Sequence, residues 1–116
     1  MEKKDADGRY KFKTTLPFGT RLLRYGNEIG HFTAPKGTLY EQLSLPYKRE
    51  TVEYHEYEVI ADGLVVTCIV EKGIAAPGFG LPGGAIQYLH EESIQRSVRK
   101  NILKRVELWG VMGNDA

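Results

Sequence analysis

The chain has 116 residues, which is the size of a single domain. Sixteen lysines and arginines against 15 aspartates and glutamates leave a formal net charge of +1, which argues against a strongly basic nucleic-acid binder. A single cysteine excludes an intramolecular disulfide framework, and no apolar run approaches the roughly 20 residues of a membrane-spanning helix. These properties predict one globular domain over residues 1–116.

The N-terminal residues differ from the rest in being almost entirely polar. We expect residues 1–9 to be disordered and the folded core to cover about 16–110. The start, Met1 to Asp5, lacks the apolar segment of a signal peptide. If the protein is exported, we therefore expect a larger parent chain or a dedicated secretion machine to deliver it.

Glycine and proline divide the middle of the chain into short predicted strands. Asp62-Gly63 lies between two apolar runs, a pattern that is typical of a β-hairpin. The segment 73–84 holds five glycines and two prolines, so it cannot form a regular element. The predicted strands cover residues 20–25, 30–33, 52–60, 64–70 and 85–89.

One helix is predicted, beginning after Ser93 as its N-cap. Apolar residues then recur at a spacing of four, which places them on one helix face: Ile94, Val98, Ile102 and Val106. Its end is open, because Asn101 could adopt the left-handed conformation that terminates helices and leave 102–109 as a final strand. The predicted fold class is β-rich α+β: a small, twisted central sheet or partial barrel with one C-terminal helix packed on it.

Most of the reactive side chains have a simple structural interpretation. The three histidines, His31, His55 and His90, are far apart and have no cysteine at ligand spacing, so we predict no metal site. Cys68 lies in an apolar run, where a buried packing role is expected. The pair Glu91-Glu92 is expected to favour the helix N-terminal dipole.

Two stretches are better candidates for a binding site. The stiff glycine- and proline-rich segment leads directly into Gln87 and Tyr88, and glycines allow a backbone to approach a ligand closely. The second stretch contains Arg24, whose guanidinium suits a phosphate, beside Tyr25 and Phe32, whose flat rings can stack on a ligand.

Taken in order, these stretches resemble the tuberculosis necrotizing toxin domain family. The resemblance covers about residues 16–108 and rests on several motifs at the right spacing: Arg24-Tyr25-Gly26, Gly30-His31-Phe32, Ala34 to Gln42, Leu45-Pro46, Tyr54 to Val59 and Ile74 to Tyr88. It implies an NAD(P)+ glycohydrolase, usually the C-terminal toxin of a larger secreted protein.

The resemblance also implies residue roles. It makes Arg24 and Gln87 the catalytic pair and places Phe32 beside the nicotinamide. Further substrate-binding residues expected on this basis and from the glycine-rich segment are Tyr25, His55, Phe79, Gly83, Gly84 and Tyr88. The sequence departs from the family pattern at Tyr25, Leu81, Ala85-Ile86 and Leu43. Leu43 stands where many members carry an arginine, which leaves the preference between NAD+ and NADP+ open.

The implied chemistry agrees with the absence of a clear carboxylate dyad in the sequence. Nicotinamide leaves NAD+ as a neutral molecule, so no general acid is required, unlike in the hydrolysis of O-glycosides. We expect a toxin that depletes NAD in the target-cell cytoplasm, uses no cofactor beyond its substrate, and has a cognate immunity protein. Two alternatives stay open: an ADP-ribosyltransferase using Glu91-Glu92, and an inert module that binds a nucleotide or a partner.

Overall fold

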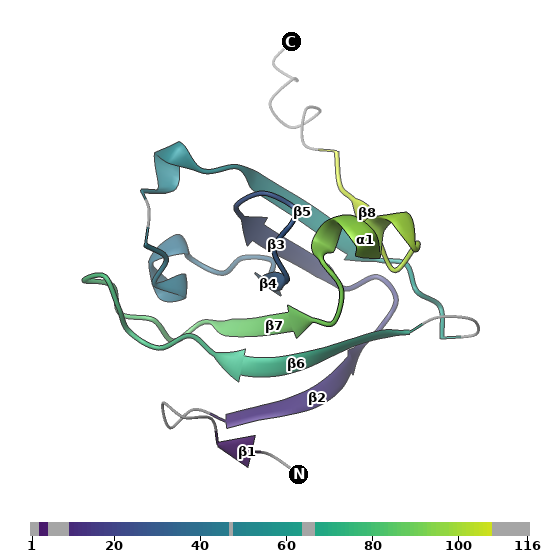
Figure 1. The fold of residues 1–116 in the computed structure, drawn as a ribbon, viewed down its shortest axis with the longest axis horizontal. Coiled ribbons are helices and arrows are strands. Elements are labelled where there is room, and N and C mark those ends of the chain that lie inside the picture. The colour runs from purple at the N-terminus through teal and green to yellow at the C-terminus, as the bar shows by residue number, and fades with distance from the viewer. Residues whose placement is uncertain (1–2, 5–9, 47, 64–66, 108–116) are drawn as a thin grey trace.

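The computed structural model describes residues 3–4, 10–46, 48–63 and 67–107 (Figure 1). Eight antiparallel strands form one sheet in the order β1-β2-β6-β7-β4-β3-β5-β8. Their bounds are β1 Lys3–Lys4, β2 Tyr10–Leu16, β3 Arg21–Tyr25, β4 Phe32–Pro35, β5 Tyr54–Val59, β6 Cys68–Ile74, β7 Ile86–His90 and β8 Leu103–Arg105. The order begins with β1 and ends with β8, and no pairing joins the two, so the sheet is open and β-rich α+β is confirmed.

The sheet has a separate apolar cluster on each face. Leu22 and Leu23 are neighbours on β3 but belong to different clusters, because successive strand residues point to opposite faces. The first cluster contains Leu16, Leu22, Tyr57, Val59, Ala61, Cys68, Val70, Ile94 and Leu103. The second contains Leu23, Tyr25, Ala34, Leu43, Ala75 and Ala85.

Different segments cover the two faces. The helix α1, Ile94–Arg99, packs Ile94 into the first cluster and lies beside β8 (Figure 1). The second cluster is covered by the irregular segment between β4 and β5, which contains two short 3-10 helices, η1 at Tyr40–Leu43 and η2 at Arg49–Thr51. Within the described residues, no helix has the length and apolar character needed to cross a membrane.

The helix begins and ends as one of the two sequence interpretations predicts. The Ser93 hydroxyl accepts a hydrogen bond from the Arg96 backbone N–H at 3.1 Å, which confirms Ser93 as the N-cap. The helix ends at Arg99, Asn101 takes the left-handed conformation with φ 59°, and the chain continues as β8. The continuation of the helix to Val106 is therefore wrong.

Three expectations about the strands need correction. The predicted Asp62-Gly63 hairpin does not form, because β5 pairs with β3 and β8 whereas β6 pairs with β2 and β7. Strand β4 begins later than predicted and includes Pro35, which lies opposite Leu22 of β3. Lys3–Lys4 forms β1, so the expected disorder of 1–9 is wrong there, and the other residues of that range lie outside the described part.

Strand β2 is absent from the sequence predictions, although it carries a usable signal. Its sequence, YKFKTTL, alternates larger or apolar side chains with lysine and threonine at the period of a half-buried strand. β2 pairs with β6 over five residues, from Phe12 opposite Lys72 to Leu16 opposite Cys68. It therefore supplies the neighbour that the predicted hairpin would have given to β6.

Candidate active site

A small hollow on the face of the second cluster brings four of the predicted site residues together. We call it the Gln87 hollow. It is lined by Leu23, Arg24, Tyr25, Phe32, Thr33, Ala34, Leu43, Leu45 and Gln87. Arg24, Tyr25, Phe32 and Gln87 were all predicted from sequence, whereas Thr33 and Leu45 were not.

The strands fix how Gln87 and Arg24 reach this hollow. Gln87 alternates with Tyr88, which packs against the first cluster, so Gln87 lies on the opposite face with Leu23 and Tyr25. Arg24 alternates with Leu23 and Tyr25, so its side chain leaves β3 on the helix-bearing face. The predicted pair therefore starts from opposite faces of the sheet, and both residues still line the Gln87 hollow.

Two nitrogen atoms of the Arg24 guanidinium donate hydrogen bonds to backbone carbonyl oxygens. Its Nε donates to the Asn27 carbonyl oxygen at 2.7 Å, and its Nη1 donates to the Phe32 carbonyl oxygen at 3.0 Å. These two bonds join the end of β3 to the start of β4 across the loop 26–31. Arg24 thus holds the backbone of Phe32, whose side chain is 47% exposed at the Gln87 hollow.

Gly30 leaves the space that the Arg24 guanidinium occupies. A Cβ added at Gly30 would lie 2.0 Å from Arg24 Nη2 and 2.6 Å from its Cζ. The guanidinium therefore lies directly against the Gly30 backbone, in a position that any larger residue would obstruct. The spacing from arginine to this glycine, noted in the sequence, has a steric cause in the structure.

The loop 26–31 is also tied to the helix and to β7 by backbone hydrogen bonds. The first helical N–H groups, from Ile94 and Gln95, donate to the carbonyl oxygens of Gly30 and Glu28, each at 2.9 Å. The His90 N–H donates to the His31 carbonyl oxygen at 2.8 Å. The loop thereby satisfies N–H groups that a helix start leaves without a partner in the helix.

Tyr25, which lines the Gln87 hollow, packs against two further aromatic rings behind it. The Tyr25 ring centroid lies 4.9 Å from that of Tyr40 and 4.9 Å from that of Tyr54. The Arg49 guanidinium stacks over the Tyr25 ring at 5.6 Å. Because Tyr25 is only 7% exposed, it serves more as a fixed support for the hollow than as an open contact surface.

The glycine- and proline-rich segment ends immediately before β7 and positions Gln87. Ala75 and Ala85 form a backbone hydrogen bond at 2.8 Å, and the Gly84 N–H donates to the Ala75 carbonyl oxygen at 2.8 Å. A Cβ on Gly83, which has φ +71°, would lie 2.7 Å from backbone atoms of the 75–77 stretch. Gly84 has φ +96° with open space around it. Close packing, rather than a ligand, thus already explains Gly83.

The remaining predicted site residues lie outside the lining of the Gln87 hollow. His55 is the cross-strand neighbour of Arg24, but its Nε2 lies 2.8 Å from Glu53 Oε1. Phe79 is 71% exposed at φ 51°, in a turn closed by Gly78 and Leu81. Tyr88 packs against the first cluster, and burial raises the pKa of its hydroxyl.

The Gln87 hollow is small compared with known ligand sites. Its volume is about 30 Å³, whereas ligand pockets usually measure roughly 300–1,000 Å³. Two larger hollows, of about 350 and 300 Å³, are both lined by His90. Neither is lined by Arg24 or Gln87, so the size of the hollows and the predicted residues indicate different positions for a binding site. A molecule as large as a dinucleotide can occupy the Gln87 hollow only if its walls move apart or if most of the molecule lies outside.

Other titratable groups near the site have structural partners. Glu92 pairs with Arg96 at 2.8 Å and with Lys100, and these contacts lower the pKa of its carboxyl group. Cys68 is buried as expected, and burial raises the pKa of its thiol to about 11. Among the described residues, no group of three or more His, Cys, Asp or Glu side chains could hold a metal ion.

Comparison with known proteins identifies the family. Residues 15–106 match the family described as tuberculosis necrotizing toxin. The chain belongs to this toxin family. The match covers both strands of the Arg24 loop, the glycine-rich segment and Gln87, and it confirms the resemblance noted in the sequence.

Similar proteins of known name support this membership of the necrotizing toxin family. The conidial surface nicotinamide adenine dinucleotide glycohydrolase of Aspergillus fumigatus is 31% identical over 100 residues, covering 80% of this chain and 41% of that protein. The structure of tuberculosis necrotizing toxin complexed with its immunity factor matches with a TM-score of 0.64 at 24% identity, covering 81% of this chain and 54% of that one. The present chain thus spans about half the length of these relatives or less.

Two further structures share the fold at lower identity. Rhs1-CT, solved in complex with its cognate immunity protein RhsI1, has a TM-score of 0.59 at 18% identity and covers 84% of this chain and 77% of its own. Tse6, solved in complex with Tsi6, has a TM-score of 0.57 at 17% identity and covers 85% and 73%. At identities of 24% and below, the likeness to all three solved structures concerns the fold alone.

Proposed function

We propose that this domain is a toxin that hydrolyses the bond between nicotinamide and ribose in NAD+, releasing nicotinamide and ADP-ribose. The observation that carries the proposal is the meeting of Arg24, Phe32 and Gln87 at one hollow in a chain of the necrotizing toxin family. The named activity of the Aspergillus glycohydrolase, 31% identical to this chain, supports the same reaction.

The proposed chemistry requires positioning more than acid–base catalysis. When the bond between the ribose C1′ and the pyridinium nitrogen breaks, the electron pair stays on that nitrogen and neutralises its charge. The ribose then carries positive oxocarbenium charge until the oxygen of water bonds to C1′ and a proton leaves to solvent. A preorganised amide carbonyl near C1′ stabilises this charge, and we assign that role to Gln87.

Arg24 and Phe32 are proposed to bind and orient the substrate. The part of the Arg24 guanidinium that does not bind Asn27 and Phe32 remains a donor group for the diphosphate. Phe32, with 47% of its surface exposed, offers a face on which the nicotinamide ring can stack. Holding reactants in this way removes much of the entropic cost of the reaction.

The other predicted site residues are proposed to support the site rather than to act on the reacting bond. We propose that Tyr25 supports the nicotinamide wall and that His55 acts on the site through its position beside Arg24. Phe79 lies within the glycine-rich segment, which we propose shifts to admit a dinucleotide, and Tyr88 follows this segment on β7. No cofactor is required, because the substrate itself provides the leaving group. NAD+ and NADP+ are both candidate substrates.

The biological setting is proposed from the same relatives. Depletion of NAD in the producing cell would be harmful, so we propose a cognate immunity protein that blocks the site. The necrotizing toxin and Rhs1-CT were each solved in complex with an immunity factor or protein, which supports the existence of such a partner. We further propose that the domain is delivered as part of a larger effector chain and acts in the cytoplasm of a target cell, in interbacterial competition. Expression without the immunity protein should arrest growth and lower cellular NAD.

An ADP-ribosyltransferase is the main alternative, and it would need a free glutamate beside the ribose. Glu92 is engaged with Arg96 and Lys100, so it is a poor candidate for this role. Purified protein given NAD+ should release nicotinamide and free ADP-ribose in equal amounts, without labelling any protein. Labelled protein would support the transferase. No turnover of NAD+ or NADP+ by folded protein would support an inert binding module and contradict our proposal.

A further inference from the structure

The loop 26–31 carries Gly30 and leads into Phe32, and it is also connected to strands β5 and β8. That connection comes from Glu28, which lies outside the Gln87 hollow. We propose that Glu28, held by Arg105 and Tyr57, is a positioning residue that sets the geometry of Arg24 and Phe32 for NAD+ hydrolysis. This inference rests on the proposed function and deepens it.

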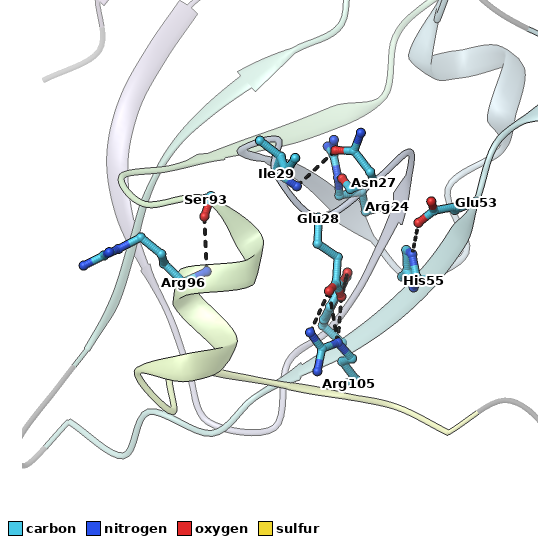
Figure 2. A network of polar contacts seen from close by, with 10 residues as sticks. Arg24, Asn27, Glu28, Ile29, Glu53, His55, Ser93, Arg96 and Arg105 are labelled. Carbon is cyan, nitrogen blue, oxygen red and sulfur yellow. Dashed lines mark hydrogen bonds and ion pairs between the residues drawn. The ribbon is translucent and has the colours of Figure 1, made fainter.

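Glu28 connects three segments that are far apart in the sequence, and Figure 2 shows its ion pair with Arg105. Arg105, on β8, donates from Nε to Oε2 at 2.8 Å and from Nη2 to Oε1 at 2.7 Å, which is a bidentate pair. The Tyr57 hydroxyl, on β5, donates to Oε2 at 2.7 Å. The Glu28 backbone carbonyl accepts from the Gln95 N–H of α1 at 2.9 Å. The residue is thus fixed by both its side chain and its backbone.

The contacts continue from Glu28 to the Gln87 hollow. Two residues after Glu28, the backbone of Gly30 forms the surface against which the Arg24 guanidinium lies. Arg24 in turn donates to the Phe32 carbonyl oxygen at 3.0 Å. A displacement of Glu28 would therefore move Gly30, and with it the support of Arg24 and the backbone that carries Phe32.

The environment of Glu28 favours a permanent charge. Its side chain is only 15% exposed, and Tyr57 is fully buried. The hydrogen bonds from Arg105 and Tyr57 lower the pKa of the Glu28 carboxyl group to about 2 despite the opposing effect of burial. A carboxylate that is largely shielded from solvent and has two strong partners fixes a loop much more firmly than an exposed ion pair does.

The test compares two ion pairs of similar length. Glu28→Gln removes the charge while keeping the shape, and Arg105→Met removes the other partner from a position that is half exposed, so this variant should fold. Arg96→Met is the matched control, because it breaks the exposed pair with Glu92 at 2.8 Å, and none of the described hydrogen bonds or ion pairs of these two side chains reaches the loop 26–31. All four proteins, including the wild type, are assayed with NAD+ for kcat, KM and Tm.

We expect Glu28→Gln and Arg105→Met to lower kcat/KM by about 10-fold to 100-fold, because small misplacements of positioned groups are costly. Arg96→Met should stay within about twofold of the wild type. A double-mutant cycle adds a measurement that a merely structural role would not affect: in an Arg24→Lys background, the effect of Glu28→Gln should shrink. Losses equal to those of Arg96→Met, or fully additive effects with Arg24→Lys, would overturn the proposal.

Hydrogen exchange separates this proposal from the proposed function. In Glu28→Gln and Arg105→Met, amides of residues 26–32 should exchange at least about tenfold faster than in the wild type and in Arg96→Met. Faster exchange in a protein that does not hydrolyse NAD+ would preserve the anchoring by Glu28 and contradict the proposed function. Unchanged exchange would overturn the anchoring itself.

Discussion

The two segments that border the Gln87 hollow are held by different kinds of contact. The loop 26–31 is anchored by side chains, through the Glu28 carboxylate and the Arg24 guanidinium. The segment 75–85 is anchored mainly by backbone hydrogen bonds among Ala75, Gly84, Ala85 and Gln42. The stability of the first segment should therefore respond mainly to changes of charge, and the stability of the second to the addition of a single carbon atom.

This difference also suggests which wall of the hollow moves. The loop 26–31 has ionic and buried partners, whereas the only side-chain hydrogen bond to the segment 75–85 among the described contacts is a long one of 3.5 Å, from the Ser44 hydroxyl to Leu81. Because a dinucleotide does not fit in the present volume, we expect the glycine-rich wall to shift on binding and the Arg24 wall to stay.

The largest effect on stability is expected at Gly83. In Gly83→Ala the added Cβ would lie 2.7 Å from backbone atoms that cannot yield easily, at φ +71°. We expect a loss of about 2–5 kcal/mol in the free energy of unfolding, measured by urea denaturation. Gly84→Ala is the matched control, since its Cβ meets open space and costs only about 1–2 kcal/mol for the left-handed backbone. Equal losses would show that packing does not hold this segment.

A fall in pH should destabilise the loop 26–31 before it affects the glycine-rich segment. His90 lies between the loop 26–31 and β4: its backbone bonds His31, and its Nε2 lies 2.8 Å from the Thr33 hydroxyl. Burial is the main cause that lowers the pKa of His90 from 6.5 to about 4. The unfolded chain therefore binds the extra proton below pH 6.5, and stability should fall as pH drops from about 6.5 to 4.

The size of this pH effect approaches about 3 kcal/mol, because each unit of pKa corresponds to about 1.4 kcal/mol. Denaturation at a series of pH values measures it, and His90→Asn should abolish the slope in that range. Glu28 provides an internal comparison, because its lowered pKa places its own loss of stability between about pH 4.5 and 2. A wild-type slope unchanged by His90→Asn would contradict this assignment.

Gly30→Ala tests the loop 26–31, which is anchored by side chains, without changing any charge. The Cβ would lie 2.0 Å from Arg24 Nη2, and the flexible guanidinium would move away rather than unfold the protein. We expect a stability loss below about 1.5 kcal/mol, together with a fall of about tenfold or more in kcat/KM for NAD+. An active Gly30→Ala protein would show that the observed Arg24 position is not the functional one.

Arg24→Ala should act mainly on substrate binding. The change removes a charge-assisted contact worth about 1.5–3 kcal/mol, which we expect to appear chiefly as a higher KM. Because Arg24 also bonds the Asn27 and Phe32 carbonyl oxygens, a modest drop in Tm should accompany it. A fall in kcat alone would assign Arg24 to the chemical step instead.

Local sequence signals predicted much of the fold. Patterns that each span only a few residues predicted the strand at Arg21–Tyr25, the strand at Ile86–His90 and the N-cap at Ser93. The hairpin at Asp62-Gly63 failed because a turn signal does not determine strand partners. Those partners come from contacts across the sheet, including β2, whose alternating pattern was overlooked.

The site was predictable only as far as family motifs extend. They identified Arg24, Phe32 and Gln87, which meet at one hollow. The pairing of Glu28 with Arg105 spans 77 positions, and no local pattern indicates it. Similarly, the contact of Gly30 with the Arg24 guanidinium depends on the path of a loop whose shape is set by the helix and β7.

The most direct test of the account is the kinetics of Gln87→Ala with NAD+, alongside its melting temperature. If Gln87 stabilises the developing ribose charge, kcat should fall by about 10²–10³-fold, with KM and Tm close to those of the wild type. If Gln87 only supports the end of the glycine-rich segment, Tm should fall while the activity per folded molecule stays near that of the wild type. That second result would contradict the proposed active site.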